Sequence, residues 1–217
     1  MSTEASGARP DAAGTAPPAG TTRLARTAPP AGAHAPAGAG PLDGIALDHR
    51  LRMVPADPAE FTRRLETAAA ELAEERRDGQ ADFARTRAVG VGLLVLGRLD
   101  HARAVLTDAS ALADTTARRI AVTINLADAH RYADTDEGRA AAEPLYLRAL
   151  ELARRHVPER VDFALQHLAK HRIDTGRFAE ARRLLDEALA LRVAAGDAEL
   201  VASTRQALAH LSAREAG

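Results

Sequence analysis

The sequence predicts an all-α fold in which about eight helices stack as antiparallel hairpins into an α-solenoid. Two series of small residues carry this prediction, and no alternating strand pattern interrupts them. The first series follows apolar residues at steps of 37, 42 and 40 residues, at Gly90, Ala127, Ala169 and Ala209. The second recurs at steps of 40 and 39 residues, at Ala102, Ala142 and Ala181. A period of about 40 residues is typical of helix pairs that bury their apolar faces only against neighbouring pairs.

Composition excludes several classes of protein. The chain has 217 residues, of which 46% are hydrophobic and 3% aromatic, so the core must consist mainly of Leu, Val and Ala. A net charge of −1 lacks the basic excess of a sequence-independent nucleic-acid binder, and no direct nucleic-acid contact is expected. The absence of cysteine excludes disulfides and thiolate chemistry.

The expected location follows from what the sequence lacks. No run approaches about 18 consecutive apolar residues, so no membrane span is expected. The N-terminus lacks the basic start and apolar run of a secretory signal, and we therefore expect a cytoplasmic protein. Lys170 is the only lysine beside many arginines and alanines, a usage that indicates a GC-rich bacterial genome.

The first 44 residues are expected to form a disordered tail. This segment is rich in Pro, Ala and Gly and holds seven of the eleven prolines, while large apolar side chains are scarce. Such a composition cannot bury enough apolar surface to offset the entropy lost on ordering. Residues 45–217 are therefore expected to form the folded domain.

The domain opens with a short stretch that precedes the first helix. Residues 45–54 mix apolar and polar positions and are expected to lie against that helix. Asp57, Pro58 and Glu60 form a helix start, since Asp caps free N–H groups, Pro fits the first turn and Glu occupies the capping-box position. Asp78-Gly79 is expected to end the helix.

Seven further helices are separated by Gly or Asp-rich breaks. Their expected ranges are about 81–96, 99–113, 116–133, 139–155, 158–175, 178–195 and 198–214. Grouped by the small-residue period, they give three repeats and a capping helix, at about 81–115, 116–156, 158–195 and 198–215.

Local motifs in these repeats add a family resemblance. Val89-Gly90 is followed by Leu93, then by the turn Gly97-Arg98-Leu99 and by Ala102, Leu106 and Ala109. A later copy runs from Leu168-Ala169 through Gly176-Arg177-Phe178 to Ala181, Leu185 and Ala188. With these residues the chain resembles the tetratricopeptide repeat (TPR) family, in the long form of kinesin light chains and many bacterial proteins. The resemblance implies a right-handed solenoid over about residues 81–215.

The resemblance also implies a concave groove that binds a protein or peptide, lined by the first helix of each pair. It places eight residues there: Arg87, Val91, Asn125, Asp128, Arg131, Gln166, His167 and Lys170. Four of these, Arg87, Asn125, Arg131 and Lys170, imitate the family's carboxylate clamp, but Asp128 would weaken a carboxylate site by repulsion. A general protein or peptide groove is therefore the first hypothesis.

No residues nominate a reaction, a cofactor or a metal. His167 and His171 lie four apart on one helical face, and the sequence identifies no third ligand for a metal, although an approach of His130 or His101 in space stays open. No nucleophile motif and no phosphate-binding loop occurs. The sequence therefore predicts a non-enzymatic adaptor without cofactor. The alternatives are a regulatory or sensor subunit of a bacterial transcription regulator or biosynthetic enzyme, and a helper enzyme. A homo-oligomer through the last helix is a further hypothesis, based on Leu200, Val201, Leu208 and Leu211.

Overall fold

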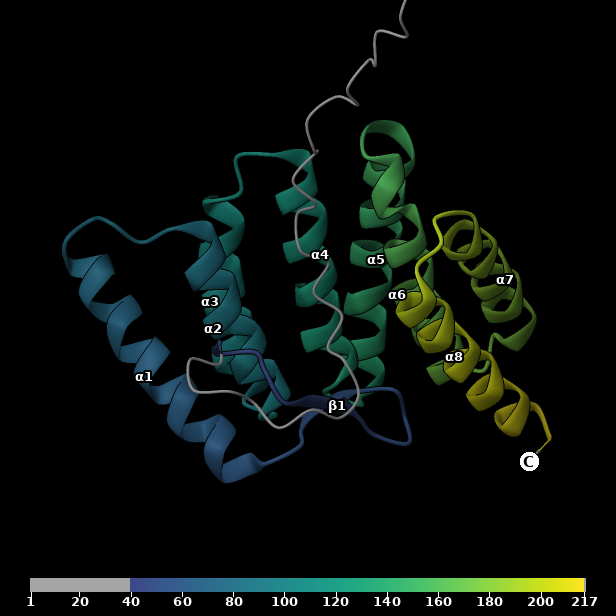
Figure 1. The fold of residues 1–217 in the computed structure, drawn as a ribbon, viewed down its shortest axis with the longest axis horizontal. Coiled ribbons are helices and arrows are strands. Elements are labelled where there is room, and N and C mark those ends of the chain that lie inside the picture. Colours follow the sequence, from purple (N-terminus) through teal and green to yellow (C-terminus); the bar gives the residue numbers. More distant parts are fainter. Residues whose placement is uncertain (1–39, 217) are drawn as a thin grey trace, which may run out of the picture.

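The computed structural model describes residues 40–216, so most of the expected tail lies outside the described residues. This part of the chain holds eight α-helices and one two-stranded sheet (Figure 1). The helices are α1 Pro58–Arg77, α2 Phe83–Val95, α3 Leu99–Ala111, α4 Thr116–Arg131, α5 Asp136–His156, α6 Val161–Asp174, α7 Phe178–Ala194 and α8 Ala198–Ala216. The expected helical class and the number of helices are thus confirmed.

Capping residues place the helix ends close to where the sequence predicts them. Asp57 caps α1, because its carboxylate accepts hydrogen bonds from the N–H groups of Ala59 and Glu60. Thr135 caps α5 by accepting from the N–H of Gly138, and α5 therefore begins at Asp136, three residues before the expected start. A side chain at position 138 would come within 2.5 Å of the His130 carbonyl oxygen, which explains the glycine.

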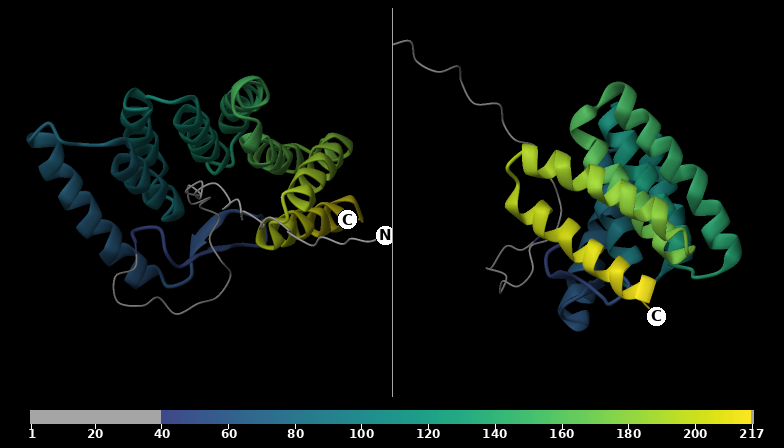
Figure 2. Two further views of the ribbon diagram at one scale, coloured as in Figure 1. Left: turned by 45° about the horizontal axis from the view of Figure 1, so that its top comes forward. Right: turned by 90° about the vertical axis from the view of Figure 1, so that its right-hand side faces the viewer.

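The helices pack in the order in which they occur along the chain. Pairs α2–α3, α4–α5 and α6–α7 form hairpins, and α3, α5 and α7 each pack against the helix that follows. Alternate helices α2, α4, α6 and α8 also contact one another in succession. The result is an arc of helices with one open side (Figure 2).

The recurring small residues lie where helices approach most closely. Ala102, Ala127, Ala142, Ala169 and Ala181 have no exposed surface. A Cβ at Gly90 would lie 2.7 Å from Cγ of Leu106 on α3. The recurring small residues therefore allow close packing between helices, as the sequence predicts.

Replacing Gly90 by leucine should overpack the α2–α3 contact. We expect a loss of about 1–3 kcal/mol in unfolding free energy, measured by urea denaturation. Ala84→Leu on the exposed face of α2 is the matched control and should change stability by about 0.5 kcal/mol or less. Equal stabilities of the two variants would contradict the proposed close approach.

An antiparallel β-hairpin precedes α1, and the sequence prediction of no strands is wrong here. Strand β1 Ile45–Leu47 pairs with β2 Met53–Pro55, with Ala46 opposite Val54. Before the hairpin, residues 40–44 form a turn, and Arg64 on α1 donates hydrogen bonds to the carbonyl oxygens of Gly40 and Asp43. The boundary expected after residue 44 therefore falls within ordered chain.

The hairpin spans the open side of the arc, between α1 and α8 (Figure 2). Ile45 belongs to the buried cluster built around α1 and α2, together with Phe61. Leu51, in the loop between the strands, belongs to the cluster of α6, α7 and α8, together with Ile173 and Leu211. One short segment thus joins the two ends of the helical arc.

The apolar stripe of the last helix faces inward. Leu200, Val201 and Leu211 are buried, and Leu208 packs against the C-terminal cluster. The exposed stripe on which the expected homo-oligomer depends is therefore not present, because these residues form the contact with the preceding helices. None of the helices within residues 40–216 is both long enough and apolar enough to span a bilayer.

Candidate functional site: a polar layer on the inner helices

The structure brings the eight predicted groove residues together along three neighbouring helices. Arg87 and Val91 come from α2, Asn125, Asp128 and Arg131 from α4, and Gln166, His167 and Lys170 from α6. Six of them are buried, while Arg87 and His167 are partly exposed. Most of the polar members therefore contact one another and the neighbouring helices more than they contact solvent.

Arg87 joins α2 to α4. Its Nε donates a hydrogen bond of 2.7 Å to Oδ1 of Asn125. Burial, with a smaller contribution from the nearby guanidinium of Arg160, lowers the pKa of Arg87 to about 10. No carboxylate forms an ion pair with Arg87 in the described part of the chain. The part of the layer that α2 contributes is therefore cationic.

Asp128 is the centre of the layer and is 1% exposed. Tyr146 of α5 donates a hydrogen bond of 2.6 Å to its Oδ1, and Nδ1 of His167 lies 3.0 Å from its Oδ2. Burial opposes ionisation, but His167, Arg131 and Tyr146 outweigh it and lower the pKa of Asp128 to about 2. Asp128 is therefore a carboxylate whose charge is balanced within the fold.

Arg131 connects α4 to the end of α6. Its Nη1 lies 3.2 Å from Oδ2 of Asp174, its Nε lies 3.6 Å from Oδ1 of Asp128, and its guanidinium stacks 5.1 Å from the ring centre of Tyr132. Burial disfavours the charge, yet Tyr146 and the two aspartates raise the pKa of Arg131 above its usual value. Arg131 is thus an internal structural cation.

Lys170 differs from its neighbours because nothing in the described residues pairs with it. It is 7% exposed and forms neither a hydrogen bond nor an ion pair within residues 40–216. Burial, with repulsion from Arg131, lowers its pKa from 10.5 to about 8. The nitrogen itself keeps contact with solvent, and it is a donor that no group within residues 40–216 occupies.

Gln166 belongs to a second network, which ties α6 to α7 and α8. Its Oε1 accepts hydrogen bonds from Arg192 and from the hydroxyl of Thr204, the latter at 2.8 Å. Arg192 also lies 2.8 Å from Oδ2 of Asp162. Gln166 therefore fixes helix packing and has little capacity left for a partner.

The two histidines of α6 point to different neighbours. The His167 ring packs at a tilt against that of Phe163, with ring centres 4.4 Å apart, and approaches Asp128. Nε2 of His171 lies 3.5 Å from Oε2 of Glu143, and its ring packs 5.5 Å from that of Tyr146. Burial lowers the pKa of both histidines. Within residues 40–216 no three His, Cys, Asp or Glu side chains are arranged to hold a metal ion.

Sequence reasoning missed three members of the layer. Tyr146, Asp174 and Tyr132 lie on α5, at the end of α6 and in the loop after α4, outside the helix faces assigned to the groove. Tyr146 is fully buried at a position that the repeat pattern reserves for packing. The only sequence signal for a polar role of Tyr146 was its hydroxyl group among aliphatic neighbours.

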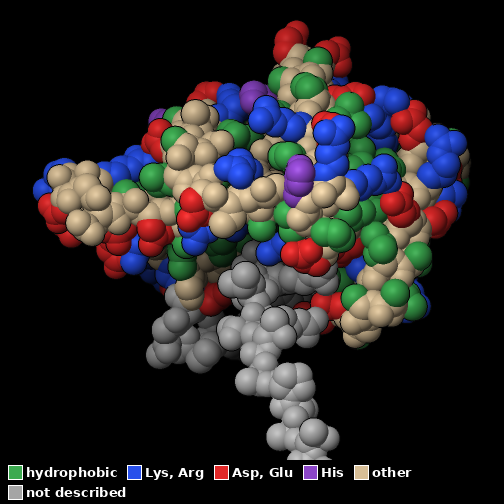
Figure 3. Space-filling model, turned by 90° about the horizontal axis from the view of Figure 1, so that it is seen from above, with side chains coloured by type: hydrophobic (Ala, Val, Ile, Leu, Met, Phe, Trp, Pro, Cys, Tyr) green, Lys and Arg blue, Asp and Glu red, His purple; other side chains and the backbone are tan. Residues whose placement is uncertain are grey.

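Basic and acidic side chains are mixed on the end of the molecule where α2, α4 and α6 begin (Figure 3). This face therefore presents no patch of a single sign. Comparison with protein-family models, curated proteins and solved structures gives no significant match to the chain.

Proposed function

We propose that the helices form a right-handed, TPR-like solenoid and that the protein is a non-enzymatic adaptor. Its concave side, lined by α2, α4 and α6, would bind a protein or peptide partner in the cytoplasm of a bacterium. The sequential packing of helix pairs supports the solenoid, as do the alanines buried between them. The family resemblance of the repeat motifs supports the function.

Lys170 is the observation that carries the proposal. The Lys170 amine has no hydrogen-bond or ion-pair partner within residues 40–216 and its nitrogen still contacts solvent, so it is available to an acceptor group of a bound segment. Arg87 and His167 are partly exposed and lie on the same layer, so they offer further donors to the same segment. Asp128 no longer argues against an acceptor there, because Arg131 lies beside its carboxylate and Tyr146 donates a hydrogen bond to it.

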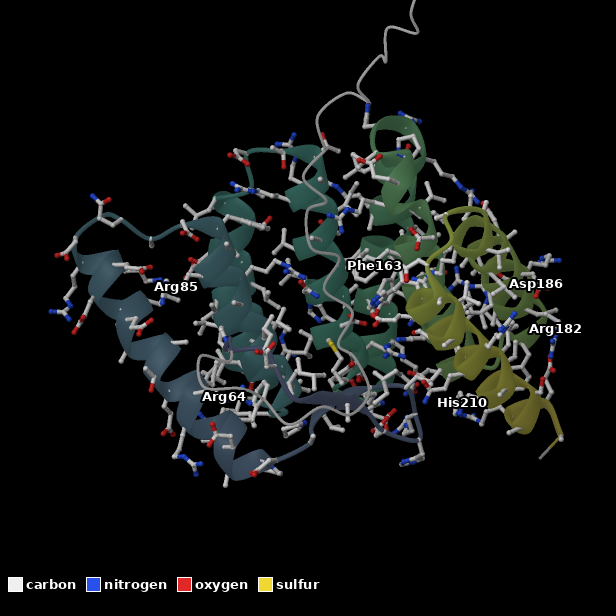
Figure 4. The ribbon with its side chains drawn as sticks, viewed as in Figure 1. Arg64, Arg85, Phe163, Arg182, Asp186 and His210 are labelled. Carbon is white, nitrogen blue, oxygen red and sulfur yellow. The ribbon has the colours of Figure 1, made fainter. Side chains whose placement is uncertain are left out.

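Photo-crosslinking in the native host tests this proposal. A benzophenone amino acid at Phe163, whose ring packs against that of His167, should give discrete adducts with a partner. The same amino acid at Arg182 of α7, which pairs with Glu215, is the control (Figure 4). We expect adducts from position 163 that position 182 does not give. Identical adduct patterns, or none from position 163, would contradict a partner in the groove.

The identity of the crosslinked protein also decides between the two candidate roles. A transcription regulator or a biosynthetic enzyme among the adducts would favour the regulatory or sensor subunit. A structural or transport protein would favour the general adaptor.

A further inference from the structure

The loop of the β-hairpin is a compact turn with its own internal hydrogen bonds. Oδ1 of Asp48 accepts from the backbone N–H groups of Arg50 and Arg52, both at 2.8 Å. The N–H of Leu51 donates to the Asp48 carbonyl oxygen at 3.0 Å. Asp48 thus sets the shape of residues 48–52 without help from the helices.

This turn contacts the helical arc through its side chains and one backbone group. Leu51 is 3% exposed and lies in the apolar cluster with Ile173 and Leu211. The Arg50 guanidinium binds the Asp134 carboxylate with two hydrogen bonds, of 2.6 and 2.8 Å. These bonds lower the pKa of Asp134. Bidentate pairs of this geometry combine strength with orientation.

Tyr132 completes the contact from the loop after α4. Its hydroxyl accepts a hydrogen bond of 2.7 Å from the N–H of Met53, and its carbonyl oxygen accepts one of 3.1 Å from Arg52. The Arg52 guanidinium also stacks 5.4 Å from the Tyr132 ring centre. His210 of α8 lies beside the hairpin loop (Figure 4).

The backbone takes a left-handed conformation on both sides of this contact, and at Leu51 this conformation is strained. Within residues 40–216 the two non-glycine residues with positive φ are Leu51, at 58°, and Asp134, at 59°. A left-handed conformation disfavours an L-residue by about 1–2 kcal/mol, and more for a bulky one. Both residues keep it while their side chains make the central interactions of the contact. Strain of the kind that Leu51 holds is typical of ligand clamps and switch regions, whereas Asp adopts the left-handed region more readily.

We propose that Tyr132, Asp134 and the apolar cluster of Ile173 and Leu211 form a docking site for a turn, which residues 48–52 occupy in cis. The site takes a turn from a partner protein with the same chemistry: a large aliphatic residue flanked by two arginines, and a preceding aspartate that closes the turn. This inference rests on the proposed function, because it names the partner class and its regulation. A partner turn enters only when the chain's own hairpin leaves.

A labelled peptide of residues 44–56 is the probe. The full chain carrying Leu51→Asp should release its hairpin, because a buried carboxylate cannot stay in the apolar cluster. We expect this variant to bind the peptide at least about tenfold more tightly than the unchanged chain, measured by fluorescence anisotropy. Adding Asp134→Ala should weaken that binding about tenfold, and a peptide with the same Leu51→Asp change should not bind. Failure of the peptide to bind the folded variant would overturn the proposal.

A second variant covers the case in which Leu51→Asp does not fold. Arg50→Ala with Arg52→Ala leaves the apolar cluster intact and removes the guanidinium contacts at the site. In this variant, excess peptide should accelerate hydrogen exchange of the backbone amides in residues 45–55. Unchanged exchange would overturn the docking site. Adducts from position 163 report the groove separately, so their presence alongside a failed peptide experiment would refute this site alone.

Discussion

Arg131→Leu should lower the free energy of unfolding by about 3–5 kcal/mol. Arg131 is 1% exposed and lies between Asp128 and Asp174, whose side chains are 1% and 4% exposed. Leucine would fill much of the volume but would leave two buried carboxylates without their shared cation. Removing one partner of a buried ion pair typically has an effect of this size, because the remaining charge is uncompensated.

Urea denaturation at neutral pH measures the loss. Arg154→Leu is the matched control, because it removes an exposed pair with Glu187, at 2.8 Å, and should cost about 1 kcal/mol or less. A loss for Arg131→Leu no larger than that of the control would show that the aspartates do not depend on Arg131.

Asp128 adds a pH dependence to the same network. Its pKa in the fold is about 2, below the ordinary carboxyl value of 3.8. The stability that it contributes is therefore fully present above the unfolded pKa and is lost as the pH falls from about 4 toward 2.

Lys170→Met should have the opposite sign and raise the free energy of unfolding by about 1–3 kcal/mol at pH 7. Burial and Arg131 lower the pKa of Lys170 from 10.5 to about 8, so the folded state disfavours its charge. At about 1.4 kcal/mol for each pKa unit, that difference sets an upper limit near 3 kcal/mol. Methionine has a similar length, carries no charge and loses no hydrogen bond within residues 40–216.

The effect of Lys170 on the free energy of unfolding should depend on pH. Because the unfolded chain keeps the Lys170 proton to a higher pH, the unchanged protein should gain stability as the pH rises from about 8 to 10. Above about 10 the buried tyrosines, whose pKa values are raised, should reverse the trend. Lys170→Met should lack the gain between 8 and 10.

Arg98→Met is the control for Lys170→Met, since Arg98 is exposed at the turn before α3. It should change stability by about 0.5 kcal/mol or less. Reductive methylation with labelled formaldehyde marks the single lysine, and its NMR signal reports the pKa directly. An ordinary lysine pKa, or a loss of stability in Lys170→Met, would contradict the prediction.

Helices could be predicted from this sequence because each is specified locally. Asp57 caps α1 within three residues of itself, and the alanines of the 40-residue period mark where helices approach closely. Thr135 acts as locally, but its cap was not recognised, and α5 therefore begins earlier than expected. The hairpin could not be predicted in the same way. Each strand has three residues, too few for an alternation of apolar and polar residues to be recognised. The hairpin also depends on residues far away in the sequence, such as Asp134, which binds Arg50 from 84 positions away.

The candidate site could also be predicted only in part. The family resemblance placed Arg87, Asn125, Asp128 and Lys170 on the first helices of the pairs, and the structure has them on the neighbouring helices α2, α4 and α6. It gave no information on how these side chains pair, because Asp128 finds Tyr146 on a different helix and Arg131 finds Asp174 at the end of another. Burial of the layer depends on those pairings, and a single sequence does not encode them as a pattern.

The strap formed by residues 45–55 also bears on how this chain unfolds. In a linear array of helix pairs, the terminal units can fray one by one, since each is held by a single neighbour. Here Ile45 packs in the cluster at one end of the array and Leu51 in the cluster at the other end. Unfolding of the last helices would therefore also remove the cluster in which Leu51 is buried. The array then behaves as a closed loop, and its melting should be a single cooperative transition rather than a series of local ones.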